Sequence, residues 1–233
     1  MSYGELFRLD GKNALITGGT GGLGAEIAEA FRESGANVKT FSHHECDITD
    51  PESVRAMLDG LDDVDILVNC AGKNILLPAE DYDDASFMDV MTLNIHALHR
   101  ITREVGKRFM IPKKSGKIVN LSSVKSIIGT DRDYIAYCSS KGALNMYTKQ
   151  LACEWGKYSI NVNAIAPTFV RTNINAFQLD DKNFYDALIH RIPLGRIGQK
   201  QDVAACAVFL CSPASDFVTG QVLCVDGGLT AKQ

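Results

Sequence analysis

The feature that most limits how this chain can fold is a regular alternation of short apolar runs with longer segments of helical periodicity. Helical spacing of apolar residues spans 22–34, 85–109, 137–156 and 201–210. Apolar runs bounded by polar residues or glycine predict strands at 13–17, 37–41, 65–69, 117–121, 160–165 and 221–225. Strands that alternate with helices pair in parallel, so the pattern predicts an α/β fold: a doubly wound parallel sheet with helices on both faces.

Length, charge and cysteine spacing narrow the function classes. The 233 residues contain no internal repeat, low-complexity tract or linker, so we expect a single domain over 1–233. A net charge of −4 argues against a nucleic-acid partner, because phosphate binding needs concentrated Lys and Arg. No apolar run approaches the ~18 residues of a membrane span, and the N-terminal segment 1–10 is too charged for a signal peptide. We therefore expect a cytoplasmic protein without a membrane partner, and the seven cysteines lack the spacing of a metal site.

A glycine-rich turn joins the first predicted strand to the first predicted helix, in the order Thr17-Gly18-Gly19-Thr20-Gly21-Gly22-Leu23-Gly24. Glycines let the backbone turn sharply and approach a pyrophosphate, and the N-terminus of the following helix supplies free N–H groups. A purely structural tight turn would also use glycines. The position between a strand and a helix favours nucleotide binding.

Tyr137 and Lys141 stand four residues apart on a predicted helix and therefore share one face. A phenol ordinarily ionises near pH ~10, and a neighbouring ammonium favours the phenolate, so we expect Lys141 to lower the pKa of Tyr137. Alone the pair is weak, because this spacing also occurs by chance on helix surfaces. Two further motifs strengthen it: Asn69-Cys70-Ala71-Gly72 and Asn120-Leu121-Ser122-Ser123, each at the end of a predicted strand.

Together these motifs resemble the short-chain dehydrogenase/reductase family over essentially the whole chain, from Leu9 to Gly228. The resemblance implies a Rossmann-like domain and an NAD(P)-dependent oxidoreductase that interconverts a secondary alcohol and a ketone. It implies Tyr137 as general acid–base, Ser123 as hydrogen-bond donor to the substrate oxygen, and Asn94 as holder of a water in a proton path. Lys141 would lower the pKa of the Tyr137 phenol and bind the hydroxyls of the nicotinamide ribose. The catalytic set is thus Asn94, Ser123, Tyr137 and Lys141.

The same resemblance assigns a set of residues to the cofactor. The glycine turn would hold the pyrophosphate, the segment after 47 the adenine ring, and the segment from 167 to 172 the nicotinamide. The assigned residues are Gly18, Thr20, Gly22, Leu23, Gly24, Ser42, Asp47, Ile48, Asn69, Ala71, Gly72, Tyr137, Lys141, Pro167, Val170 and Thr172.

The chain departs from the family pattern in three places. Ser123 precedes Tyr137 by 14 positions, one more than is usual in the family, which indicates an extra residue within 129–134 and leaves Ser122 pointing away from the site. The connection 42–46 is too short for a crossover helix, so a third parallel strand at this point must be very short if it is present. Thr168 replaces a glycine after Pro167.

The segment 173–198 occupies the place of the family's substrate lid and is rich in polar side chains. With Lys73, Lys125 and Arg132 near the same edge of the sheet, it predicts a small polar substrate such as a sugar, polyol or sugar acid. Three alternatives stay open: solvated lid residues without a binding role, a reductase of a hydrophobic or acyl-carrier-bound ketone, and a non-catalytic nucleotide-binding redox sensor or scaffold. The resemblance also implies a homotetramer or homodimer paired through helices 85–109 and 137–156, although packing on the sheet alone would explain their apolar faces.

Cofactor choice depends on the residue at the end of the second predicted strand. NAD-selective enzymes place an acid there, which binds the ribose 2′-hydroxyl and repels a 2′-phosphate. That position falls on Ser42, and His43 and His44 follow as donors to a phosphate, whereas Glu45 stands near enough to bind the ribose diol. The balance predicts NAD(H) or NADP(H) with a slight preference for NADP(H).

Overall fold

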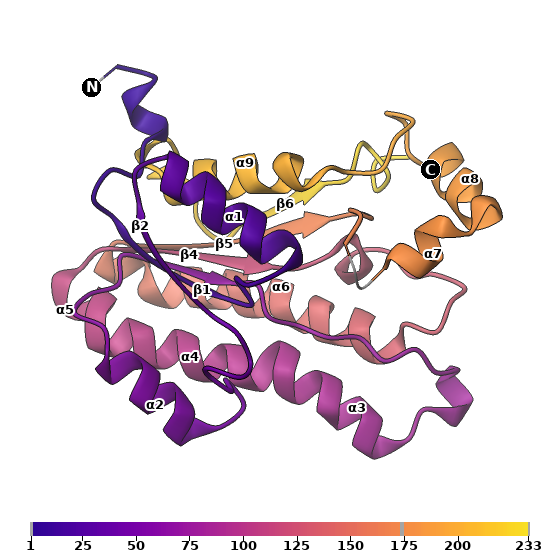
Figure 1. Ribbon diagram of the computed structural model, residues 1–233, viewed down its shortest axis with the longest axis horizontal. Helices are drawn as coiled ribbons and strands as arrows, with labels where there is room; N and C mark the ends of the chain where they lie inside the picture. Colours follow the sequence, from indigo (N-terminus) through magenta and orange to yellow (C-terminus); the bar gives the residue numbers. More distant parts are fainter. Residues whose placement is uncertain (1, 173–174, 233) are drawn as a thin grey trace.

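The computed structural model describes residues 2–172 and 175–232, and in these residues six parallel strands form one sheet between two layers of helices (Figure 1). The strand order is β2-β1-β3-β4-β5-β6. The strands are β1 (Asn13–Thr17), β2 (Asn37–Phe41), β3 (Ile66–Asn69), β4 (Gly116–Leu121), β5 (Ile160–Pro167) and β6 (Val222–Val225). The predicted α/β fold and all six predicted strands are confirmed, with small shifts at their ends.

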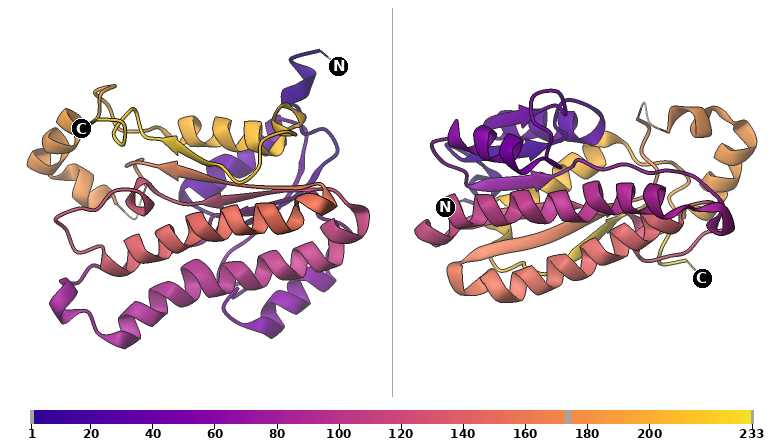
Figure 2. Two further views of the ribbon diagram at one scale, coloured as in Figure 1. Left: turned by 180° about the vertical axis from the view of Figure 1, so that it is seen from behind. Right: turned by 90° about the horizontal axis from the view of Figure 1, so that it is seen from below.

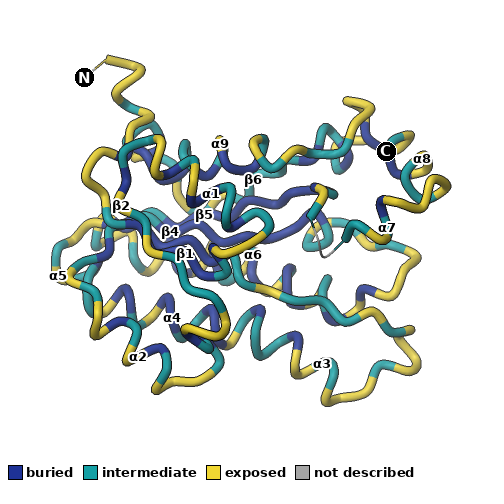
Figure 3. The backbone as a smooth tube through the Cα atoms, in the orientation of Figure 1, coloured by how far each residue is buried: buried dark blue, intermediate teal, exposed yellow. Residues whose placement is uncertain are grey.

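Helices cover both faces of the sheet, as a doubly wound fold requires. On one face α1 (Gly22–Glu33) and α9 (Lys200–Cys211) pack on the buried side chains of β1, β3 and β4. On the other face lie α2 (Pro51–Asp59), α4 (Leu98–Val105) and α6 (Ile135–Trp155), with a second apolar core beneath them. The buried strands form the dark centre of the tube in Figure 3, between partly exposed helices. No described helix has the length and hydrophobicity needed to cross a membrane.

One long helical run lies beside α6 along the lower face of the sheet (Figure 2). It contains α3 (Asp84–Met91), the π-helical segment Thr92–Ala97, α4, a second π-helical segment at Gly106–Met110, and α5 (Ile111–Lys113). The sequence predicts this helix over 85–109. It ends later because the chain turns only at Lys114, in the left-handed conformation with φ of 52°. π-Helical turns inside α-helices are frequent at functional sites, and the first one carries Asn94.

The connection after β2 is as short as its length predicts. Residues 42–50 form turns, and no further strand pairs with β2 among the described residues, so β2 is the edge of the sheet. The chain then forms α2, which the periodicity analysis missed. Asp50 begins this helix by accepting hydrogen bonds from the backbone N–H groups of Glu52 and Ser53, with Pro51 in the first turn. The capping signal was thus present in the sequence, in a helix too short for a clear apolar period.

A small third apolar cluster joins the last part of the chain to the loop after β4. It includes Leu179 of α7 (Ala176–Asp180), Leu188 of α8 (Lys182–Arg191), and Val124. These two helices project beyond the carboxyl ends of the strands in Figure 1. They form part of the predicted lid 173–198, of which residues 173 and 174 lie outside the described residues.

Candidate active site

Parallel register brings the predicted motifs to one edge of the sheet. Thr17 pairs with Asn69, and Asn69 pairs with Asn120, so the carboxyl ends of β1, β3 and β4 lie side by side. The chain leaves β1 toward β2 on one side and begins β3 on the other, which makes the β1/β3 boundary the topological switch point. Ligands of doubly wound folds bind in the crevice at this point.

The glycine turn is locked against the segment that follows β3. Gly18 has φ of 64°, and a Cβ there would lie 2.9 Å from the backbone nitrogen of Ala71. The hydroxyl of Thr17 accepts hydrogen bonds from the N–H groups of Cys70 and Ala71, at 3.2 and 3.3 Å. A Cβ on Gly24 would collide with the carbonyl oxygen of Gly18, so the start of α1 also needs a glycine.

This turn leaves a cradle that fits a pyrophosphate. Helix α1 begins at Gly22, and Gly21 before it provides no side-chain cap; the first turn contains no acidic residue. Its first N–H groups and positive dipole end therefore remain available to an anion. Gly22, with φ of 55°, faces the side chain of Thr172, whose Cγ2 lies 3.7 Å from the position of an added Cβ. The predicted pyrophosphate and nicotinamide segments thus lie side by side.

The segment after β2, Ser42–Thr49, which we call the adenosine end, is exposed at His43, His44 and Glu45 and is bonded locally. Ser42 donates hydrogen bonds from its N–H and hydroxyl to the carboxylate of Glu45, at 2.8 and 2.7 Å, and these bonds lower the pKa of Glu45. The carboxylate of Asp47 accepts from the hydroxyl and the N–H of Thr49, which lower its pKa against a small effect of burial. Ile48 is buried in the core. The assignment of Asp47 and Ile48 to the adenine ring stays a prediction.

Four side chains predicted to act together do lie together, with one more that the sequence analysis missed. Lys141 is buried, and its Nζ donates to the carbonyl oxygen of Leu121 at 2.6 Å and lies 5.5 Å from the centroid of the Tyr137 ring. Ser123 is buried in the same corner, and its side chain lowers the pKa of Tyr137. Around them gather the residues that we call the catalytic corner: Asn94, Ser123, Tyr137, Ser140 and Lys141.

The expectation that Lys141 lowers the pKa of Tyr137 is wrong in this geometry. Burial raises the pKa of Tyr137 to about 12, and the side chain of Ser123 lowers it by less. Burial also lowers the pKa of Lys141 to about 8. The spacing on the helix places the two groups together, but both are desolvated, and the ammonium donates to Leu121 rather than to the phenol.

Asn94 is buried in the π-helical segment and ties three parts of the site together. Its Oδ1 accepts from the N–H of Lys73, and its Nδ2 donates to the carbonyl oxygen of Lys73, both at 2.9 Å. The second amide N–H donates to the hydroxyl of Ser140 at 3.0 Å, which in turn donates to the carbonyl oxygen of Tyr137. Both amide donors are therefore used, and a water held by this side chain would have to donate to Oδ1. Ser140 was overlooked, although it directly precedes Lys141.

Two residues at the strand ends serve the scaffold. The amide of Asn69 donates to Thr102 and to Asn120, at 3.0 and 2.9 Å, so its side chain points into the helical layer. The hydroxyl of Ser122 donates to Asn145 of α6 at 2.6 Å, which agrees with the expectation that it points away from the site.

The segment after β5 completes the crevice. Pro167 ends the strand, Val170 is buried and forms a bridge with Gly198, and the N–H of Thr172 donates to the side chain of Asn175 at 2.8 Å. No group of three or more His, Cys, Asp or Glu side chains in the described part of the chain is arranged to hold a metal.

The nucleotide cradle and the serine, tyrosine and lysine beside it define a nucleotide-dependent dehydrogenase of the doubly wound α/β class. A family model described as Enoyl-(Acyl carrier protein) reductase matches residues 39–230. The chain is 35% identical to galactitol 2-dehydrogenase (L-tagatose-forming) of Cereibacter sphaeroides and 36% identical to gluconate 5-dehydrogenase of Gluconobacter oxydans, each over 99% of both proteins. The chain belongs to the short-chain dehydrogenase/reductase family and is an NAD(P)-dependent oxidoreductase that acts on CH–OH groups.

Solved structures agree with this placement. The gluconate 5-dehydrogenase of Burkholderia cenocepacia, in complex with NADP and tartrate, superposes with a TM-score of 0.91 at 33% identity, over 98% of this chain and 99% of that one. The alignments to the two relatives named above extend over 253 and 256 residues, against 233 in this chain. The relatives therefore carry residues that this chain lacks, which is consistent with the short connection after β2.

Proposed function

We propose that this oxidoreductase interconverts a secondary alcohol and a ketone in a small polyhydroxylated molecule, with Tyr137 as general acid–base. The observation that carries the proposal is the catalytic corner, in which the buried Ser123 and Lys141 gather around Tyr137 and Nζ of Lys141 lies 5.5 Å from the centroid of its ring. This group stands at the switch point beside the glycine cradle. A proton donor and a hydride carrier must approach the same carbon–oxygen bond, and this placement provides for both.

The side chains divide the work of the reaction. The hydroxyl of Ser123 donates a hydrogen bond to the substrate oxygen, and the phenol of Tyr137 gives it a proton as negative charge develops there. With its pKa raised by burial, the phenol is protonated at neutral pH, as the acid in ketone reduction must be. Bound nicotinamide supplies or accepts the hydride. Lys141 would hold the nicotinamide ribose, while Asn94 and Ser140 fix the backbone on either side of the corner.

Substrate class is inferred from chemistry and from relatives. The relatives named above act on galactitol and gluconate, and a further one, 36% identical over 97% of this chain, is D-threitol dehydrogenase of Mycolicibacterium smegmatis. The polar lid agrees with such substrates. A panel of polyols, aldonates, sterols and acyl-carrier thioesters tests the proposal, because faster turnover of the hydrophobic or acyl-carrier substrates would contradict it.

The same panel separates an enzyme from a redox sensor or scaffold. A sensor binds the nucleotide without turning over any alcohol or ketone, whereas the enzyme shows both nucleotide binding and turnover. The presence of Tyr137 beside the buried Asn94, Ser123 and Lys141 supports the enzyme.

For the cofactor we propose use of both nucleotides, with a small preference for NADP(H). His43 and His44 are exposed at the adenosine end, where a 2′-phosphate would accept hydrogen bonds from their ring N–H groups. Glu45 opposes this preference through its negative charge, although Ser42 already donates two hydrogen bonds to its carboxylate. The ratio of kcat/KM for the two nucleotides measures the balance.

We also propose a homodimer or homotetramer paired through the two long helices predicted over 85–109 and 137–156, which correspond to the helical run that begins with α3 and to α6. Met88, Ile135 and Met146 on these helices are among the exposed large apolar side chains. Burying such side chains against a second copy would release apolar surface from water. Light scattering coupled to size exclusion gives the stoichiometry.

A further inference from the structure

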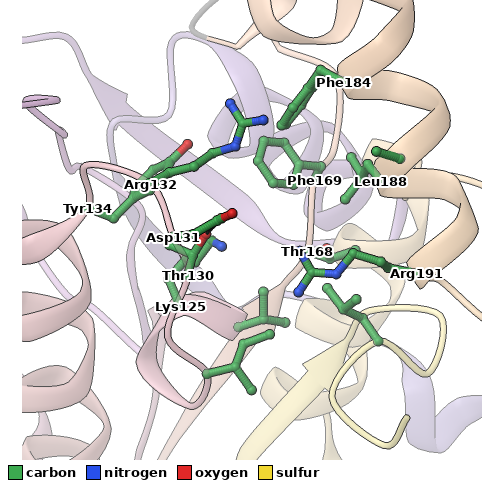
Figure 4. Close-up of a pocket in the computed structure, with 14 residues that line it drawn as sticks. Lys125, Thr130, Asp131, Arg132, Tyr134, Thr168, Phe169, Phe184, Leu188 and Arg191 are labelled. Carbon is green, nitrogen blue, oxygen red and sulfur yellow. Dashed lines mark hydrogen bonds between the residues drawn. The ribbon is translucent and has the colours of Figure 1, made fainter. Parts of the chain in front are cut away.

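A cavity of about 170 Å³ lies between the loop that follows β4 and helix α8 (Figure 4). Tyr134 lines it, and the centroid of the Tyr134 ring lies 6.2 Å from that of Tyr137. The cavity is therefore one aromatic ring away from the proposed proton donor. It is smaller than the roughly 300–1,000 Å³ of pockets for drug-sized ligands, so it suits one end of a small molecule.

The cavity carries an excess of positive charge. Its lining includes three cations and one carboxylate: Lys125, Arg132, Arg191 and Asp131. Among the described residues, none of the three cations forms an ion pair within 4.0 Å. Lys125 is partly buried, and burial lowers its pKa, with Arg191 and Arg132 adding repulsion that Cys138 and Asp131 oppose. Arg132 and Arg191 are exposed, so the partly buried Lys125 bears most of the cost of this repulsion, and a bound anion would offset it.

Aromatic rings hold two of these cations without using their hydrogen-bond donors. The guanidinium carbon of Arg132 lies 4.6 Å from the centroid of the Phe184 ring, and Nζ of Lys125 lies 5.2 Å from that of Tyr134. Figure 4 shows the guanidinium of Arg132 directed toward Phe184. Arg191 approaches from the opposite wall, at the end of α8. Cations held in this way remain free to donate to a ligand.

An independent observation marks the same cavity. The hydroxyl of Thr168 is buried without a hydrogen-bond partner in the described part of the chain, and Thr168 is only 8% exposed. It lines the cavity, and Arg191 extends toward it (Figure 4). A buried hydroxyl without a partner costs free energy, which a ligand oxygen would recover. Thr168 is also the residue that replaces a glycine of the family pattern.

We propose that Arg191 and Thr168 bind the carboxylate of the substrate, so that the preferred substrate is a polyhydroxy acid rather than a neutral polyol. This inference rests on the proposed function, because it places the reacting carbon at Tyr137 and the acid group one ring away. A guanidinium presents paired N–H donors that match the two oxygens of a carboxylate. Lys125 and Arg132 supply further positive charge around the bound anion.

The test compares kcat/KM for D-gluconate with that for galactitol, a neutral six-carbon polyol. Arg191→Gln should lower kcat/KM for gluconate about 10–100-fold, mainly through KM, because a hydrogen bond to a charged group is lost. Galactitol turnover should change less than about threefold. Thr168→Val should lower gluconate turnover by about fivefold, and Thr168→Ser should retain it. Arg55→Gln changes an exposed arginine of α2 that is paired with Glu52, and it should leave kcat/KM for both substrates unchanged.

A binding measurement separates this inference from the proposed function. In the presence of nucleotide, tartrate should raise the melting temperature of the wild-type protein but not that of Arg191→Gln. Equal losses for both substrates, or unchanged gluconate turnover in Arg191→Gln, would overturn the inference. Faster turnover of glucose 6-phosphate than of gluconate would also overturn the inference, because the cations would then bind a phosphate. If tartrate binds through Arg191 but no alcohol or ketone reacts, the proposed function fails and the anion site stands.

Discussion

The catalytic corner and the adenosine end both lie at the carboxyl ends of the strands, but their side chains are held in place in different ways. In the corner, Asn94, Ser140 and Lys141 are buried, and each is bonded to a group from another segment of the chain. At the adenosine end, Ser42 bonds Glu45 and Asp47 bonds Thr49, within a few residues and in contact with water. A buried hydrogen-bond network fixes the position of each side chain, whereas an exposed network between near neighbours in sequence allows several side-chain conformations. We therefore expect large effects of substitution in the corner and small ones at the adenosine end.

The largest expected effect tests the corner directly. Tyr137→Phe removes the proposed proton donor and keeps the ring, so turnover should fall by about 10²–10⁴-fold or more. Nucleotide affinity should stay near that of the wild-type protein. Tyr147→Phe is the matched control, because it removes a phenol hydroxyl from the same helix, one that lies 3.3 Å from Nδ1 of His99. More than a tenth of wild-type turnover in Tyr137→Phe would assign proton transfer elsewhere.

The glycine cradle, which joins the two regions, should give the next largest effect. In Gly24→Ala the new Cβ meets the carbonyl oxygen of Gly18, so the turn must shift away from the pyrophosphate position. We expect nucleotide affinity to fall by roughly tenfold or more, as for loss of one or two good hydrogen bonds. Gly156→Ala, directly after α6, is the control, since nothing lies within 4 Å of its Cβ and its φ of −54° suits any residue. Nucleotide titration by fluorescence measures both, and equal affinities would refute the steric argument.

The ionisation of Lys141 and Tyr137 in the catalytic corner should make the free energy of unfolding depend on pH. The pKa of Lys141 is lowered from 10.5 to about 8, so between these values the unfolded chain binds more protons than the folded one. The free energy of unfolding should therefore rise with pH across this window. Above pH ~10, Tyr137 acts in the opposite direction, because its raised pKa keeps a proton that the unfolded chain loses.

Comparison with Lys141→Met isolates the lysine contribution. The wild-type protein should gain on the order of 1–3 kcal/mol relative to this variant as pH rises from 7.5 to 10. Urea unfolding at several pH values gives the difference, and other ionisable groups cancel in it. A difference that stays constant over this range would mean that Lys141 is not desolvated as its burial indicates.

The same contrast explains what the sequence could predict. The strands could be predicted from the spacing of apolar residues. That Ser123, Tyr137 and Lys141 lie close together could be predicted from the parallel register of the strands and from the family resemblance. The direction of the pKa of Tyr137 did not, because spacing along a helix gives proximity but not burial. The buried hydroxyl of Thr168, which has no hydrogen-bond partner in the described part of the chain, depends on how the segment after β5 meets the loop after β4 and α8, and no local sequence pattern determines that arrangement.

The smallest expected effect lies at the adenosine end. Glu45→Gln removes the negative charge that opposes a 2′-phosphate and retains an oxygen that can accept hydrogen bonds from Ser42. Because exposed charges interact weakly, the ratio of kcat/KM for NADP(H) to that for NAD(H) should rise only about two- to fivefold, and less at high salt. Glu52→Gln, at an exposed acid on α2, is the matched control and should leave the ratio unchanged. A rise of a hundredfold or more would mean that Glu45 alone selects the nucleotide. The adenosine end would then be as strictly determined as the catalytic corner, despite its exposure and its local hydrogen bonds.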